Sequence, residues 1–340
     1  MRLSDDRFVL ITGASGFLGT YLAEACREAG HRVLGIDIRA PRQGIQWADF
    51  WIQSCESVEW EHFLRSRAVK VVFHLAGGAS VPESVQYPYE DFVSSVPGTV
   101  KLLSYITRHD PSIHLVFFSS AAVYGNPREC PVAEGAPALP ISPYGIHKAG
   151  SELLLQHYAR LYSLRTSILR VFSAFGPGLE KQLFWDLATR AFRAVGLGEK
   201  SMTVHGTGLE SRDFIFATDI ARAALAVANR PGLTGCECFN VASGRETTIA
   251  EAASRLIEHL AIDLKLVFSG IVRPGEPLNW RADVTKLTAT GFEPQVSLSD
   301  GIRTLADWLK LRLLEGGSTH GTAPLRNDRP EAAQAVPVQK

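Results

Sequence analysis

Tyr144 and Lys148 carry a phenol and an amine, two groups that can take part in proton transfer. They are four residues apart and follow Pro143, so a helix beginning there places both side chains on one face. A free phenol has a pKa of about 10 and is a poor base near neutral pH. A neighbouring ammonium lowers that pKa because it stabilises the phenolate. The pair therefore indicates acid–base chemistry, although the same spacing also occurs in ordinary surface helices.

A glycine-rich turn near the N-terminus indicates a second functional element. Gly13, Gly16 and Gly19 lie in the stretch ITGASGFLG, between an apolar run and an amphipathic run. Glycines there allow a tight turn and close approach of a pyrophosphate, and a following helix offers free N–H groups and a positive dipole end. Asp37 ends the next apolar run, where a carboxylate suits a ribose diol. The pattern predicts a dinucleotide site; a glycine-rich turn without a ligand is the alternative.

The residues near Asp37 bear on which dinucleotide binds. A carboxylate repels a 2′-phosphate and so favours NAD, whereas Arg39 and Arg42 would suit the phosphate of NADP. We expect NAD, whose oxidised nicotinamide would add a second positive charge near the phenol. Asp49 and Phe50 are candidates for binding the adenine amino group and ring. A loop aspartate and a core phenylalanine are the alternative reading of these two residues.

Strand and helix patterns alternate along the chain around these residues. Runs that read as strands occupy residues 7–12, 31–37, 69–77, 113–120 and 165–172. Helical patterns between them occupy residues 15–30, about 86–109 and 143–162. Strands that are apolar throughout and separated by helices imply a parallel sheet that is covered on both faces. The sequence therefore predicts an α/β fold with a doubly wound, Rossmann-type parallel sheet.

Beyond residue 172 the alternation becomes irregular. Helical patterns occupy residues 182–194, 218–230 and 248–261, and short strand-like runs occupy 201–208, 238–244 and 264–270. We predict a smaller, interleaved C-terminal substrate domain. The expected division is an NAD-binding domain of residues 1–172 and about 214–245, a substrate domain of about 173–213 and 246–314, and a disordered tail of 315–340.

Composition excludes several classes of protein. The chain has 35 basic and 35 acidic residues, and a zero net charge argues against a general binder of nucleic acid or membrane surfaces. The five cysteines are irregularly spaced and indicate reduced thiols rather than a metal site. No stretch has the length of a signal core or membrane helix, so a soluble, cytoplasmic protein is expected.

Five motifs together resemble a known family. TGASGFLG, HLAG, SSAAVYG, SPYGIHK and SRDFIFATDIA occur in the order and spacing of the extended short-chain dehydrogenase/reductase family. The similarity is greatest to its NAD-dependent epimerase/dehydratase group, which acts on nucleotide sugars and includes UDP-galactose 4-epimerase. It extends from about residue 7 to 312.

The resemblance implies roles for individual residues. Ser120 would bond the sugar oxygen, Tyr144 would be the acid and base, and Lys148 would bind the nicotinamide ribose and lower the pKa of the tyrosine. Ser119 points to the other side of its strand. The implied cofactor contacts also include Ser15, Phe17, Leu18, Leu75, Ala76 and Gly77. The implied substrate contacts are Ser80, Ser120, Ser173, Gln182, Arg212 and Arg273.

Some of these assignments have alternatives. Arg212 could instead form an ion pair with Asp213 or Glu210, and Arg273 could pair with Glu276. Ser95 and Ser173 stand where relatives often have asparagine, which changes the expected substrate contacts. His147 and His205 are expected to be structural or solvent-facing.

The resulting prediction is an NAD-dependent nucleotide-sugar epimerase, acting at C4 through a transient 4-keto intermediate. A reductase or dehydrogenase of a nucleotide keto-sugar is the alternative, followed by a non-catalytic regulator. Ala121 and Ala122 occupy positions where family 4,6-dehydratases have Asp-Glu, so no loss of water is expected. A homodimer is expected, formed by two helices through apolar residues such as Leu102, Leu153 and Tyr158.

Overall fold

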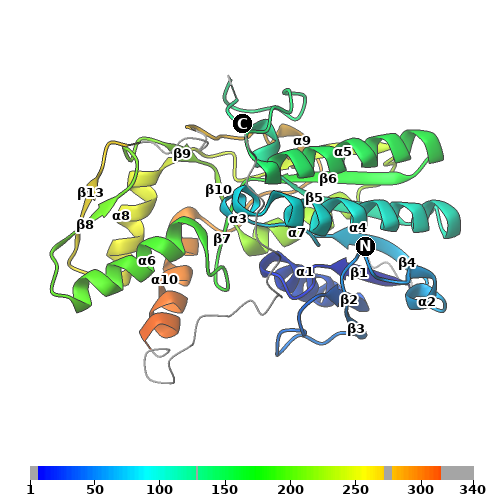
Figure 1. Ribbon diagram of the computed structural model, residues 1–340, viewed down its shortest axis with the longest axis horizontal. Helices are drawn as coiled ribbons and strands as arrows, with labels where there is room; N and C mark the ends of the chain where they lie inside the picture. Colours follow the sequence, from blue (N-terminus) through cyan, green and yellow to red (C-terminus); the bar gives the residue numbers. More distant parts are fainter. Residues whose placement is uncertain (1–6, 128, 272–277, 315–340) are drawn as a thin grey trace, which may run out of the picture.

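A seven-stranded parallel sheet lies at the centre of the computed structural model, which describes residues 7–127, 129–271 and 278–314 (Figure 1). The strand order is β11-β6-β5-β4-β1-β2-β3. The strands are β1 (Phe8–Thr12), β2 (Val33–Asp37), β3 (Asp49–Ile52), β4 (Val69–His74), β5 (His114–Ser120), β6 (Arg165–Val171) and β11 (Cys236–Val241). Every pair is parallel, so all carboxyl ends meet at one edge of the sheet. The predicted doubly wound α/β fold is confirmed.

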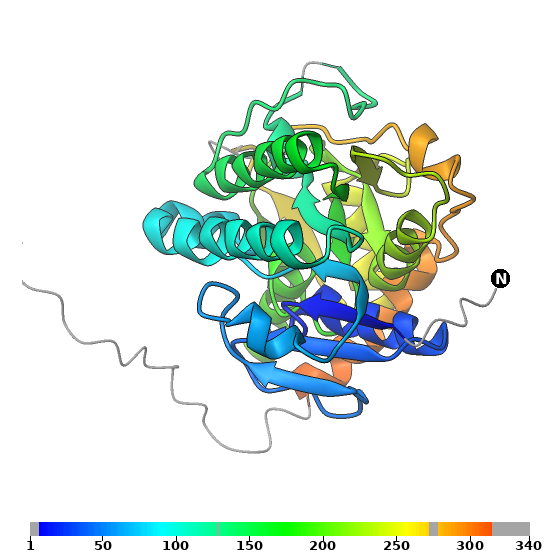
Figure 2. The same cartoon turned by 90° about the vertical axis from the view of Figure 1, so that its right-hand side faces the viewer.

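Helices cover both faces of this sheet. On one face α1 (Phe17–Glu28) packs beside α7 (Ala217–Ala228). On the other face α4 (Pro88–His109) lies beside α5 (Pro143–Tyr162), as Figure 2 shows. The strands serve both layers because their side chains alternate. In β1, Val9 and Ile11 join the core under α1 and α7, while Leu10 joins the core under α4 and α5.

The α4 helix differs in one respect from the prediction. Leu102 was expected on its outward face, but it is fully buried in the core beneath the helix, so that expectation is wrong. The reason is the helical period, which turns Leu102 and Leu103 toward the sheet and Phe92 outward. On α5, Leu153 is exposed as expected, whereas Tyr158 packs partly against the same core.

A smaller unit lies beside the sheet at its carboxyl edge (Figure 1). It consists mainly of α6 (Gln182–Gly196), β8 (Ser201–Val204), α8 (Ile249–Leu260), β13 (Lys265–Phe268) and α10 (Leu298–Leu314). These elements share a separate core that includes Leu187, Leu256 and Leu305. The α10 helix was not among the predicted elements. The predicted domain boundaries stay a prediction, and the predicted tail lies outside the described residues.

Several short elements follow the sheet strands or lie on the segments that run between the two units. They are η1 (Ala121–Tyr124), α3 (Val81–Gln86), β7 (Ser173–Phe175), β9 (Ser211–Arg212), β10 (Phe214–Phe216) and β12 (Thr247–Thr248). Two further short helices, α2 (Trp60–Leu64) and α9 (Thr285–Thr288), lie at the periphery. The chain leaves the sheet for the smaller unit after β6. It returns to the sheet with α7 and β11, and it enters the smaller unit again with α8.

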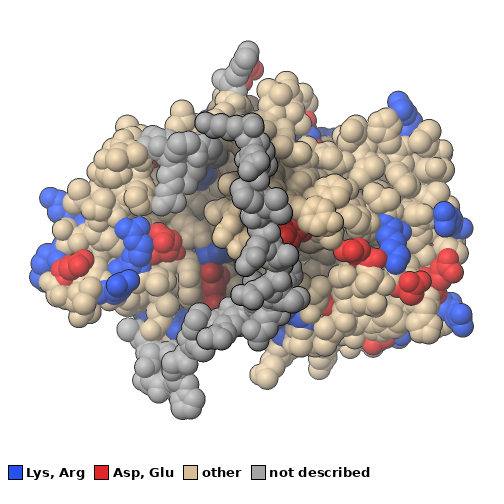
Figure 3. Space-filling model, in the orientation of Figure 1, with Lys and Arg blue, Asp and Glu red and all other residues tan. Residues whose placement is uncertain are grey.

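The surface carries charges of both signs. Lys and Arg side chains are interspersed with Asp and Glu over the face in Figure 3, in keeping with the zero net charge. Within the described ranges, no helix is long and apolar enough to cross a membrane. The five cysteines are free thiols, and Cys26 and Cys55 are buried.

Candidate active site

The glycine loop joins β1 to α1 at the carboxyl edge. Gly13 has φ +70°, and a Cβ there would lie 2.8 Å from the Ala76 nitrogen and 2.9 Å from the Leu75 carbonyl carbon. A Cβ at Gly19 would overlap the Gly13 carbonyl oxygen. Backbone therefore packs directly on backbone here. Gly16, the N-cap of α1, provides no side-chain cap, so the first N–H groups of the helix keep the capacity to bind an anionic group.

Asp37 stands beside this loop at the end of β2. Its buried carboxylate accepts the Ser15 N–H at 2.9 Å and the Arg39 N–H at 3.0 Å. The Arg42 Nε donates to the Ser15 carbonyl at 3.1 Å. The carboxylate is thus fixed at the loop, where it is suited to ribose hydroxyls, and the Arg39 side chain is 64% exposed.

Five of the other predicted cofactor contacts lie at the glycine loop, and two do not. Phe17 and Leu18 begin α1, and Leu75, Ala76 and Gly77 follow β4, so the fold brings these five residues to the glycine loop.

Asp49 and Phe50 are placed elsewhere. Asp49 lies opposite Leu34 at the start of β3, whereas Ile52 at the end of β3 lies opposite Asp37. The Asp49 carboxylate is 2.5 Å from an Arg67 guanidinium nitrogen, and Phe50 packs edge-on against Trp47. The structure does not bring these two residues to the carboxyl edge, and their contacts favour the alternative of an ion pair and a core ring.

Ser120 and Tyr144 are brought together from two elements. Ser120 ends β5 and caps η1, where its Oγ accepts the Ala122 N–H at 3.2 Å. Tyr144 lies in the first turn of α5, and its N–H donates to the Ser84 Oγ at 3.0 Å. A hydrogen bond from Ser120 acts on the phenol of Tyr144. The catalytic pair that was predicted from sequence therefore shares one location.

Lys148 lies beneath Tyr144 on the same helix. Its side chain is buried, and Nζ donates to the Phe118 carbonyl at 3.0 Å. Nζ is 5.8 Å from the centroid of the Tyr144 ring. Burial lowers the pKa of Lys148 to about 8, and the Asp91 and Glu152 carboxylates act in the opposite direction.

The pKa of the Tyr144 phenol is raised in the protein, whereas the sequence led us to expect that Lys148 would lower it. Burial raises the pKa of Tyr144, the Ser120 hydrogen bond lowers it, and the Asp91 carboxylate raises it further. Among the protein's own groups burial is the largest influence, so Tyr144 holds its proton at neutral pH. The lowering of this pKa that the sequence suggested would have to come from charge added when ligands bind.

His74 connects three elements beneath the site through hydrogen bonds. No sequence motif had marked it as a candidate. Its Nδ1 is 2.7 Å from the Thr12 Oγ1, and its Nε2 is 2.9 Å from the Thr99 Oγ1. The Thr99 hydroxyl donates to the Ser95 carbonyl, so it accepts from His74 Nε2–H, and His74 Nδ1 then accepts from Thr12. A neutral imidazole therefore ties the ends of β1 and β4 to α4.

The predicted substrate residues that the structure describes lie on or at the starts of short elements or helices that follow the sheet strands or begin the smaller unit. Ser80 caps α3, Ser173 begins β7 and Arg212 lies on β9. Gln182 begins α6 with φ +67°, an uncommon conformation for a residue at the start of a helix. Arg273 lies outside the described residues.

Arg212 on β9 and Lys181 directly before α6 carry positive charges on or next to these elements. The Arg212 guanidinium carbon is 5.6 Å from the centroid of a Trp280 ring, and NH1 donates to the Ser211 carbonyl at 2.8 Å. Lys181, which sequence reasoning missed, donates from Nζ to the Ala79 carbonyl at 2.5 Å. Burial lowers the pKa of Lys181. No motif marks Lys181, because its position depends on how α6 approaches the loop after β4.

Comparison with known proteins identifies the family. Residues 9–242 match the model of the NAD dependent epimerase/dehydratase family, so the chain belongs to this family. A putative UDP-glucose 4-epimerase of Methanocaldococcus jannaschii is 27% identical, with 89% of this chain and 98% of the relative covered.

Solved structures of UDP-sugar 4-epimerases are also similar to this chain. The UDP-glucose 4-epimerase of Thermotoga maritima, solved with UDP-glucose, has a TM-score of 0.80 at 29% identity, covering 90% of this chain and 99% of its own. The UDP-glucuronic acid 4-epimerase of Bacillus cereus, in complex with UDP-glucuronic acid and NAD, has a TM-score of 0.79 at 26% identity, covering 89% and 98%. The predicted family, the class of NAD-dependent epimerase and the NAD cofactor are confirmed. The glycine cradle and Asp37 fit this dinucleotide.

Proposed function

We propose that the protein is a UDP-sugar 4-epimerase in which Tyr144 is the acid and base. The observation that carries the proposal is the meeting of Ser120, Tyr144 and Lys148 at the sheet edge that also holds the glycine loop. The named relatives that act on C4 of UDP-sugars support the choice of substrate.

The chain's own residues account for the proton movements. Ser120 hydrogen-bonds the C4 oxygen of the sugar. Tyr144, having released its own proton to solvent once the charge of the bound ligands lowers its pKa, takes the proton of the C4 hydroxyl. Held by the glycine loop and Asp37, NAD would supply the reversible hydride chemistry that interconverts the C4 alcohol and the 4-keto sugar. Tyr144 then gives its proton back to the C4 oxygen. Lys148 keeps a positive charge beneath the phenol, which stabilises the transient phenolate.

The diphosphate of the substrate needs cations close to it. Arg212 is the leading candidate, since a guanidinium suits phosphate oxygens geometrically, and Lys181 is a second candidate. Ser80, Ser173 and Gln182 are proposed as neutral contacts, and Arg273 stays a proposal from the sequence.

The test is incubation of the purified protein with UDP-glucose, UDP-galactose and the corresponding uronates, without added cofactor. We expect formation of the C4 epimer of at least one substrate. A Tyr144→Phe variant should retain bound NAD and lose at least about a hundredfold in rate, because the ring remains and the acid–base hydroxyl is removed. Near-normal turnover of that variant would remove Tyr144 from the mechanism. Turnover that requires added NADH would favour the keto-sugar reductase.

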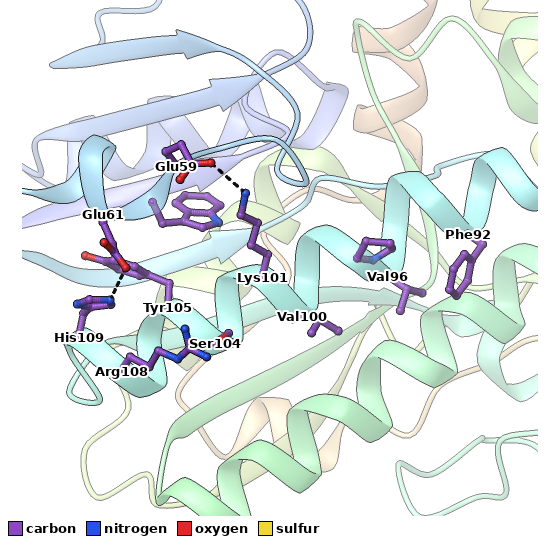
Figure 4. Close-up of a pocket in the computed structure, with 12 residues that line it drawn as sticks. Glu59, Glu61, Phe92, Val96, Val100, Lys101, Ser104, Tyr105, Arg108 and His109 are labelled. Atoms are coloured by element: carbon purple, nitrogen blue, oxygen red, sulfur yellow. Dashed lines mark hydrogen bonds and ion pairs between the residues drawn. The ribbon is translucent and has the colours of Figure 1, made fainter.

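A homodimer through α4 and α5 forms part of the proposal. The outward side of α4 carries Phe92, Val96 and Val100 at four-residue spacing along a groove of about 570 Å³ (Figure 4). Leu153 on α5 is 55% exposed beside it. A second copy related by two-fold symmetry would bury these apolar side chains. Light scattering should give the mass of a dimer at micromolar concentration, and a monomer alone would contradict the interface.

A further inference from the structure

Asp91 is a buried carboxylate that the mechanism above does not use. It lies on α4, its side chain is 7% exposed, and its Oδ2 is 2.6 Å from Nδ1 of His147 on α5. This distance is typical of a charge-assisted hydrogen bond, in which the imidazole N–H donates to the carboxylate. A buried carboxylate is costly unless it is paired, so its retention here requires a reason.

The position of Asp91 is next to the catalytic residues. Tyr144, His147 and Lys148 occupy positions i, i+3 and i+4 of α5, so all three face the same side as the Asp91 carboxylate. Gly78, in the loop after β4, packs directly against the same carboxylate. A Cβ at Gly78 would overlap Oδ1 of Asp91. The Asp91 carboxylate therefore fits in this position because residue 78 is a glycine.

Asp91 acts electrostatically on both catalytic groups. It raises the pKa of Tyr144 and that of Lys148. The remaining groups that face Tyr144 and Lys148 are the Ser120 hydroxyl from β5, the Glu152 carboxylate from α5 and the imidazole of His74 from β4.

Glu152 differs from Asp91 in its own partners. Its carboxylate is bound by the Arg170 guanidinium, with Nε at 3.0 Å from Oε1 and NH2 at 2.6 Å from Oε2. The Ser119 hydroxyl also donates to it at 2.5 Å. The positive charge of Arg170 therefore offsets much of the negative charge of Glu152, whereas the partner of Asp91 is an imidazole. Asp91 is thus the stronger candidate for setting the charge states of Tyr144 and Lys148.

We propose that Asp91, oriented by His147, is a positioning residue that sets the pH range in which the Tyr144–Lys148 pair works. Its charge holds the Lys148 ammonium in place and keeps the proton on Tyr144 until substrate and cofactor are bound. The kinetic part of this proposal rests on the proposed function, and the electrostatic part does not.

The test replaces Asp91 by asparagine, which has nearly the same shape and no charge. In the pH profile of kcat for epimerisation, which reports on the enzyme with its ligands bound, both limbs should move to lower pH by about one unit, since a neighbouring charge has an effect of about this size. The acid limb moves because deprotonation of Tyr144 becomes easier, and the alkaline limb because Lys148 loses its proton earlier. At a pH above the alkaline limb, the rate should fall about tenfold.

His147→Asn is the matched control. An asparagine amide can place an N–H donor near the position of Nδ1 and leaves the Asp91 charge intact, so both limbs should stay where they are in the wild-type enzyme. A lower but unshifted profile for Asp91→Asn would mean that Asp91 is merely structural, and would overturn the proposal.

A second measurement does not require turnover. The phenolate absorbance of Tyr144 is obtained by subtracting the titration of Tyr144→Phe from that of the wild type, and by the same subtraction in the Asp91→Asn background. The midpoint should be about one pH unit lower without Asp91. Equal midpoints in the two backgrounds would overturn the proposal even if the enzyme proves to act on a different substrate.

Discussion

Acidification should destabilise the protein through two buried histidines. His74 is 0% and His114 is 1% exposed, and both imidazoles form hydrogen bonds with hydroxyl groups. Burial lowers the pKa of His74 to about 3 and that of His114 to about 4, and the Lys148 and Arg165 charges act in the same direction. In the unfolded chain both would titrate near the ordinary pKa of about 6.5.

The magnitude follows from the difference between these values. Above pH ~7.5 both histidines are essentially neutral in the folded and unfolded states, and their stabilising contribution is fully present. As the pH falls below about 6.5, the unfolded chain binds protons that the folded protein does not. At about pH 5 this costs roughly 1.5 times 1.4 kcal/mol, or about 2 kcal/mol for each histidine.

Urea unfolding at about pH 8 and pH 5 measures this effect. His74→Gln and His114→Gln replace each imidazole by an amide that can bond to the same hydroxyls and does not titrate. Each variant should lose about 2 kcal/mol less than the wild type between the two pH values. Asp213, whose pKa burial raises to about 6, acts in the opposite direction but equally in all variants. An identical pH dependence in the variants and the wild type would refute the reasoning.

Two other predictions concern the cofactor loop and the product. Gly13→Ala should abolish NAD binding measured by calorimetry, because the methyl group would meet backbone atoms at 2.8 and 2.9 Å at φ +70°. Gly150→Ala, where nothing lies within 4 Å of the added Cβ, should bind NAD normally. Ala121 and Ala122 cannot transfer protons, so mass spectrometry should find no main product lighter by one water; finding it would contradict both the lack of dehydration and the epimerase assignment.

The positions of the proposed catalytic residues were predictable from the sequence because local signals place them, whereas their roles came from the resemblance to the family. Ser120 ends an apolar run, and Tyr144 and Lys148 follow a proline that begins a helix, so the strand and helix bounds were enough to bring them to one edge. The glycine turn is a local signal of the same kind. The parallel sheet followed from continuous apolar runs, which only a doubly covered sheet produces.

The residues that were misplaced or missed depend on distant parts of the chain. Asp49 was a candidate for the adenine because a carboxylate accepts a hydrogen bond from the exocyclic amine, and the short β3 strand, with its sequence DFWI, carries no local sign of where it begins. Its place at the start of the strand is evident only from the register with β2. The partners of Asp91 and His74 likewise come from other elements, with His147 lying 56 residues beyond Asp91. Such pairs carry no local pattern.

A deuterium label at C4 shows whether the hydride returns to the carbon that it left. The purified protein is given a UDP-sugar that carries deuterium at C4, with no added cofactor, and the product is examined by NMR. If the hydride leaves C4 and returns to the same carbon within one turnover, the C4 epimer should keep nearly all of its deuterium. An epimer that has lost the label to solvent, or turnover that depends on added cofactor, would contradict the account.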